Sequence, residues 1–120
     1  TRQQQCDLIA TELMGWKKYE PKSTEGSVES DWYWEPCNME QGEFNPFNNW
    51  EHTGMVLDRL DELRIHKKSL SFFRESVWVH NVTLSCLGNY WNLSTEGESE
   101  KSAICLAVLE LITKHPEVLR

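Results

Sequence analysis

Side chains that could bind a metal ion are present in the sequence, but they are widely separated. There are four histidines and four cysteines, at His52, His66, His80, His115, Cys6, Cys37, Cys86 and Cys105. No cysteines form a CxxC pair, and no histidine lies at ligand spacing from a cysteine or a carboxylate. The sequence therefore predicts no metal site and no cofactor.

The best pairing of a nucleophile with a base is Cys86 with His80, which share one face of a predicted strand. Side chains on one face of a strand repeat about every 6.6 Å, so these two groups would lie about 20 Å apart. The sequence holds no GxSxG or HExxH motif and no glycine-rich phosphate loop. We therefore expect a protein that is not an enzyme.

A segment rich in acids and aromatic rings is the strongest candidate for a binding surface. Positions 20–51 hold eight acidic residues and one lysine, in a chain of net charge −7. Consecutive rings at Trp32, Tyr33 and Trp34 must point to both faces of a strand, so at least one ring should lie outside the core. Exposed rings among carboxylates are typical of protein-binding hot spots. The predicted partner-binding residues are Asp31, Trp32, Tyr33, Trp34, Glu35, Glu40 and Glu43.

The alternative is that a neighbouring loop covers Tyr33 and that these rings are only structural. The remaining tryptophans considered, Trp16, Trp50 and Trp78, occur in core-like patterns, and we expect them to pack in the interior.

Overall charge and cysteine usage limit the partners and the compartment. A net charge of −7 repels nucleic acid, so we expect no direct binding of DNA or RNA. The expected partner is a protein with a basic surface. No segment predicts a membrane span, and unpaired, reduced cysteines favour a cytoplasmic protein. We expect a monomer or a small homo-oligomer.

The helix predicted over Ser99–His115 organises the rest of the chain. Its apolar residues cover most of its surface, so it must be buried on more than one side. A loop at Ser94–Gly97 should precede it. Periodicity predicts a first helix over Gln3–Met14.

A second helix is predicted over Asn49–Arg64, with Asn48 as its N-cap. Its buried face should carry Trp50, Gly54, Leu57, Leu60, Leu63 and part of Val56. We expect another element to approach closely at Gly54, because glycine within a helix costs about 1 kcal/mol relative to alanine.

Alternation of apolar and polar residues predicts strands within Val28–Glu35 and over Ser69–Glu75, Val77–Cys86 and Tyr90–Leu93. His66–Lys68 is expected to be a short link and Cys37–Gly42 a loop. Neighbouring strands should form an antiparallel meander. The predicted fold class is therefore α+β: a small antiparallel sheet of three to four strands, packed with three helices in a layered sandwich, in a single domain over residues 1–120.

Three separated motifs together resemble one family of small phage and prophage proteins, the phage ABA sandwich domain. They are Leu13-Met14-Gly15-Trp16, Phe44-Asn45-Pro46 with Trp50, and Ala103-Ile104-Cys105-Leu106-Ala107. The resemblance spans roughly residues 7–113 and implies a layered fold and a phage or prophage origin. It implies no catalytic residues. The chain departs from the family at Phe47-Asn48-Asn49 and in a longer loop at positions 20–42.

This resemblance, together with the acidic charge, favours a small phage accessory protein that binds a host protein in the host cytoplasm. A sharper hypothesis is inhibition of a host nucleic-acid-processing defence, as anti-CRISPR proteins do. The alternatives are a module that sequesters a small molecule or a signal nucleotide through Arg59, Arg64 and Lys67, or a structural phage protein.

Overall fold

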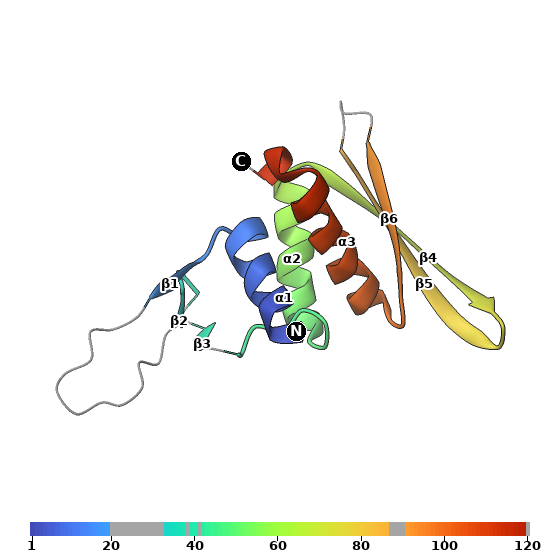
Figure 1. The fold of residues 1–120 in the computed structure, drawn as a ribbon, viewed down its shortest axis with the longest axis horizontal. Coiled ribbons are helices and arrows are strands. Elements are labelled where there is room, and N and C mark those ends of the chain that lie inside the picture. The colour runs from blue at the N-terminus through green and yellow to red at the C-terminus, as the bar shows by residue number, and fades with distance from the viewer. Residues whose placement is uncertain (20–32, 38, 41, 87–90, 120) are drawn as a thin grey trace.

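The computed structural model describes residues 1–19, 33–37, 39–40, 42–86 and 91–119. The elements in chain order are helix α1 (Arg2–Leu8), π-helix η1 (Ile9–Leu13), strands β1 (Lys17–Tyr19), β2 (Tyr33–Glu35) and β3 (Met39–Glu40), helix α2 (Trp50–Glu62), strands β4 (Ile65–Arg74), β5 (Val77–Cys86) and β6 (Asn92–Gly97), helix α3 (Glu100–Lys114) and 3-10 helix η2 (Pro116–Leu119). The predicted α+β class is confirmed. Figure 1 shows the helices between the hairpin of β4 and β5 and a small sheet at the other end.

Helix α3 is the central element of the core, as predicted. The Ser99 hydroxyl accepts a hydrogen bond from the Ser102 amide at 3.1 Å and caps its N-terminus. One side of α3 packs on β5 and β6, and the other packs on η1 and α2. Because both sides are covered, most of its apolar residues are buried, namely Ala103, Ile104, Cys105, Ala107, Val108 and Leu111.

The first helix changes geometry in its second half. Thr1 closes a capping box with Gln4 at the start of α1, and the chain then continues as the single π-turn segment η1. Gly15 ends the helical segment with φ +71°, a conformation that glycine adopts at little cost. The predicted helix is confirmed, apart from this π-helical segment.

Helix α2 begins one residue later than predicted, and its buried face agrees with the prediction at Val56 and Leu60 but not at Trp50. Asn49, not Asn48, is its N-cap, and its side chain accepts from the amides of Glu51 and His52. The buried residues are His52, Thr53, Val56 and Leu60. Trp50 was expected in the core, but it is 54% exposed and lies under the ammonium of Lys101 at 4.6 Å. Nothing lies within 4 Å of a Cβ built on Gly54, so the expected close approach there is wrong.

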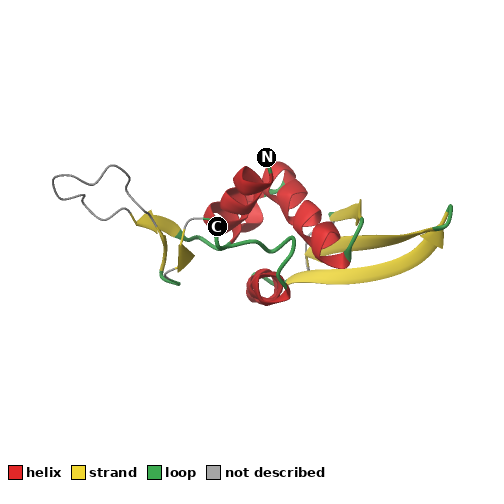
Figure 2. Ribbon diagram, turned by 90° about the horizontal axis from the view of Figure 1, so that it is seen from below, coloured by secondary structure: helices red, strands yellow, loops and turns green. Residues whose placement is uncertain are grey.

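Strands β4, β5 and β6 form the predicted antiparallel meander, in the order β4-β5-β6. Two predicted boundaries were wrong: His66–Lys68 belongs to β4 and is not a link, and Ser94–Gly97 belongs to β6 and is not a loop. Ile65, Val82, Leu84 and Leu93 are buried on the face that packs on the helices. Figure 2 shows β4 and β5 extending well beyond the helices.

A second sheet, in the order β1-β2-β3, lies in the region where the sequence predicted one strand and a loop. The strand predicted within Val28–Glu35 is confirmed at Tyr33–Glu35, and its earlier residues lie outside the described part of the chain. Met39 and Glu40 form β3 where a loop was expected. None of the helices in the described residues is long and apolar enough to cross a membrane.

Candidate functional site

A cluster of aromatic rings attaches the small sheet to the helices. The ring centroids of Trp16 and Phe44 are 4.8 Å apart in a T-shaped contact, and those of Trp16 and Trp34 are 6.4 Å apart. Trp34 is 1% exposed. Trp34 was predicted to contact a partner, but its burial makes it a core residue that fixes β2 in place. Trp16 is buried, as expected.

Two polar side chains buried on α2 hold the turn that precedes it. The Asn45 amide donates to Nδ1 of His52 at 2.9 Å, and the Thr53 hydroxyl donates to the Pro46 carbonyl at 2.7 Å. The imidazole of His52 also lies 5.4 Å from the Phe44 ring, centroid to centroid. These contacts fix the path of the chain between β3 and α2, and therefore the end of the small sheet.

Three of the predicted site residues, Glu35, Glu40 and Glu43, are exposed at this end of the molecule. The Glu43 carboxylate accepts from the Glu40 amide at 2.8 Å, which holds these two acids close together. Glu35 pairs across the sheet with Lys17, so its charge has a cationic neighbour. None of the three acids forms an ion pair within the described residues. We call these three residues the acidic end.

The other predicted site residues cannot be placed. Asp31 and Trp32 lie outside the described residues, and only the backbone of Tyr33 is described, opposite Tyr19 and Glu40. The structure therefore brings three of the seven predicted residues to one exposed end and places a fourth, Trp34, in the core.

The tip of the β4–β5 hairpin is an exposed apolar surface that sequence reasoning missed. Trp78 was expected to be buried, but it is 59% exposed and makes a T-shaped contact with Phe73 at 5.5 Å. Strand β6 ends at Gly97, opposite His80, so it does not reach Val77 or Trp78. The tip also carries Leu70 and Val77, which are both more than half exposed. We call Leu70, Phe73, Val77 and Trp78 the hairpin tip.

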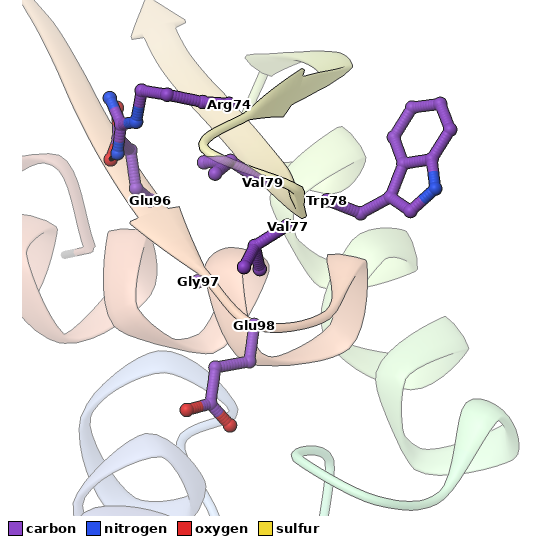
Figure 3. A pocket seen from close by; sticks show the side chains of 7 residues that line it. All are labelled: Arg74, Val77, Trp78, Val79, Glu96, Gly97 and Glu98. Carbon is purple, nitrogen blue, oxygen red and sulfur yellow. Dashed lines mark hydrogen bonds and ion pairs between the residues drawn. The ribbon is translucent and has the colours of Figure 1, made fainter.

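A pocket of about 440 Å³ lies where the hairpin tip leaves β6, lined by Arg74, Val77, Trp78, Val79, Glu96, Gly97 and Glu98. Arg74 and Glu96 form an ion pair across it at 2.9 Å, and Figure 3 shows the Trp78 indole pointing away from that pair. The described residues that line the pocket include no histidine, cysteine or hydroxyl side chain. The pocket is therefore better suited to binding an apolar group than to catalysing a reaction.

The histidines are dispersed among separate contacts. His80 forms a hydrogen bond with the Ser71 hydroxyl at 2.8 Å across β4 and β5, and His115 stacks on Trp91 at 4.7 Å. His52 is engaged with Asn45. Within the described residues, no three His, Cys, Asp or Glu side chains gather as a metal site requires.

Of the three cations considered for a nucleotide pocket, Arg59 and Lys67 contact other groups, and Arg64 lines neither pocket described here. Nε of Arg59 donates to the Leu13 carbonyl at 3.0 Å, and its guanidinium also forms an ion pair with Glu62. Lys67 lies 3.3 Å from Glu100. Neither group lines the pocket at the hairpin or the polar pocket of about 320 Å³ between α3 and Phe47.

Comparisons with known proteins give one likeness in structure. No family model and no curated protein sequence matches the chain. A crystal structure of a phage protein from Bacillus cereus ATCC 14579 aligns with a TM-score of 0.61, covering 94% of this chain and 88% of that one. The two sequences are 15% identical over the alignment. The likeness shows that this chain has the fold of a phage protein.

Proposed function

We propose that the chain is a phage accessory protein that acts by binding another protein, with the acidic end as its contact surface. The observation that carries the proposal is the grouping of Glu35, Glu40 and Glu43, exposed and outside every ion pair of the described residues. Carboxylates that form no ion pair within the described residues can attract a basic partner, and Glu40 and Glu43 also have no cation as their cross-strand neighbour. The fold shared with a phage protein supports the phage origin.

The proposed family is the phage ABA sandwich domain, on the strength of the three motifs described above. In the fold, Trp16 and Phe44 from the first two motifs contact each other, and Ala103, Ile104, Cys105 and Ala107 from the third are buried in α3. Apart from the exposed Trp50, these motif residues therefore serve the packing of the helices.

The finer proposal concerns the partner. A host protein that processes nucleic acid presents a basic cleft, because it must bind a phosphate backbone. Residues 20–51 carry eight acids and one lysine, and they can compete for such a cleft as a mimic of that charge. We therefore propose an anti-CRISPR-like inhibitor, not an enzyme, which acts in the host cytoplasm.

Sequestration of a signal nucleotide is less well supported. It requires cations that converge on a pocket, whereas Arg59 and Lys67 are already paired with Glu62 and Glu100. Neither pocket described above is lined by them.

The test reverses the acidic end, with a matched control. In Glu35→Lys/Glu40→Lys/Glu43→Lys, we expect loss of the host protein that the unchanged chain captures from lysate. The control, Glu12→Lys/Asp58→Lys/Asp61→Lys, changes the charge by the same amount at exposed helical positions and should retain capture. Undiminished capture by the first variant, or equal loss in both, would contradict the proposed surface.

The inhibitor proposal is tested separately in cells. A host that carries a defined CRISPR system should regain phage plaques when it expresses the unchanged chain, and should not when it expresses the acidic-end variant. Full immunity in the presence of the unchanged chain would argue against inhibition of that system, while the capture experiment would still report on protein binding.

A further inference from the structure

Strand β4 is a long, uncovered edge of the main sheet. It runs for ten residues, and within the described part of the chain it pairs only with β5; among its own residues only Ile65 is buried. An edge strand presents unpaired backbone N–H and C=O groups, and a second strand can add to it. Strand β4 lies at one edge of the sheet, because β5 separates it from β6.

The two halves of β4 differ in a way that suits antiparallel self-pairing. The first half carries the cations Lys67 and Lys68, and the second half carries the rings of Phe72 and Phe73, with Leu70 midway between them. Because Lys67 already lies 3.3 Å from Glu100, the charge complementarity depends mainly on Lys68. In antiparallel pairing, the first half of one strand lies opposite the second half of the other. In such a pair, the lysines of each strand therefore lie opposite the phenylalanines of the other strand, where a cation can contact a ring.

We propose that β4 pairs antiparallel with β4 of a second copy, about a two-fold axis at Leu70, to form a continuous six-stranded sheet. In this register Lys67 lies opposite Phe73 of the second copy, and Lys68 lies opposite Phe72. Both members of each pair share a face of the sheet, because directly opposed residues in an antiparallel pair do so. Because the two-fold axis passes through a residue, the helices of both copies also lie on the same side of the sheet.

The same register covers the two rings on the helix-facing side of the hairpin tip, Phe73 and Trp78. Phe73 pairs with Trp78 on the helix-facing side of the hairpin, yet both rings are more than half exposed because the helices of the same chain do not reach them. Helix α2 packs on β4, and β4 begins three residues after α2 ends. Antiparallel pairing brings the start of the second β4, and the α2 beside it, toward these rings.

Charge repulsion does not oppose this pairing where Arg74 meets the second copy. Arg74 lies opposite His66 of the second copy, and the guanidinium of Arg74 is already paired with Glu96 at 2.9 Å. The proposed interface is distinct from the acidic end, so its test requires no host protein.

The first test is the mass in solution. Sedimentation should give twice 14.1 kDa for the unchanged chain. Leu70→Asp places two carboxylates face to face at the axis and should weaken association by at least about tenfold. Val77→Asp adds the same charge to the tip on β5 and should remain a dimer. A monomer at every concentration, or equal dissociation of both variants, would overturn the proposal.

The second test reads the register. Leu70→Cys should form a disulfide with itself across the axis under mild oxidation, identified by mass spectrometry of the linked peptide. Ser69→Cys should not, because its counterpart lies two residues further along the partner strand. Cross-linking of both cysteines alike, or of neither, would contradict pairing centred on Leu70, and circular dichroism of both variants establishes that they are folded.

Discussion

The Cβ that an alanine would place at Gly97 meets the backbone nitrogen of Ala103 at 2.7 Å. The same atom would lie 3.0 Å from the Ala103 Cα and 3.2 Å from its Cβ. Thr95, two residues earlier on β6, donates its hydroxyl to the Ala103 carbonyl at 2.9 Å. Strand β6 therefore lies directly on the first turns of α3, and only glycine fits at this point.

Gly97→Ala should accordingly destabilise the fold. Because the nearest atoms belong to the helix backbone, they cannot move aside without shifting α3, and overpacking of this kind costs about 1–3 kcal/mol. Chemical denaturation should show a lower midpoint with an unchanged slope. A midpoint equal to that of the unchanged chain would show that β6 and α3 are not packed this closely.

Gly54→Ala, by contrast, should stabilise the fold. Gly54 lies in the middle of α2, and nothing lies within 4 Å of the added Cβ. Replacing a helical glycine by alanine in open space raises the free energy of unfolding by about 0.5–1 kcal/mol. The same denaturation experiment measures it, and a loss of stability would contradict the position of α2. Gly97→Ala and Gly54→Ala are the same substitution in two different surroundings, so each serves as the control for the other.

Thr53→Val tests the buried contact between α2 and the preceding turn. The substitution keeps the shape of the side chain but removes the hydroxyl that donates to Pro46, so the loss should be about 1–3 kcal/mol. Thr113→Val is the control, since its hydroxyl donates to the Leu109 carbonyl at an exposed site. Equal effects in the two variants would count against a special role for Thr53.

The buried thiols predict a decline in stability at alkaline pH. Burial raises the pKa of the Cys105 thiol from 9.0 to about 12, and the neighbouring Cys6 thiol adds to the effect. The unfolded chain releases this proton near pH 9.0, but the folded chain retains it. The contribution of the protonated Cys105 thiol to the free energy of unfolding is therefore complete below pH 9 and is lost as the pH rises toward 12. In Cys105→Ala this part of the pH dependence should be smaller, as measured by denaturation at a series of pH values.

The same burial should order the cysteines by reactivity, because the thiolate is the reacting form. Iodoacetamide at mildly alkaline pH should label Cys37 and Cys86, which are half-buried, before Cys6 and Cys105. Peptide mass spectrometry of briefly treated native protein gives the order. Early labelling of Cys105 would show that the interior opens readily.

Local sequence signals predicted α3 and the β4–β5 hairpin well. The wide apolar stripe defines α3 without reference to other elements. The alternation in Val77–Cys86 defines β5 in the same way. Both signals depend on neighbouring residues, so a single sequence contains them.

The failures involve contacts between distant residues. Apolar spacing assigned Trp50 to the buried face of α2, but His52 and Thr53 take that place because Asn45 and Pro46 satisfy their polar atoms. Likewise, the pattern around Trp78 is that of a half-buried strand, and its exposure follows from where β6 ends. In the candidate site, the sequence correctly predicted the exposed acids but also assigned Trp34 to the contact surface. Alternation along a strand does not say which of its two faces packs against the core.

The acidic end and the hairpin lie at opposite extremes of the molecule, with the three helices between them (Figures 1 and 2). Occupation of one therefore leaves the other accessible. If two copies join through β4, their acidic ends face away from the junction, and the assembly becomes bivalent. Such an assembly can hold two target molecules, or two sites on one target with an avidity that a lone copy lacks.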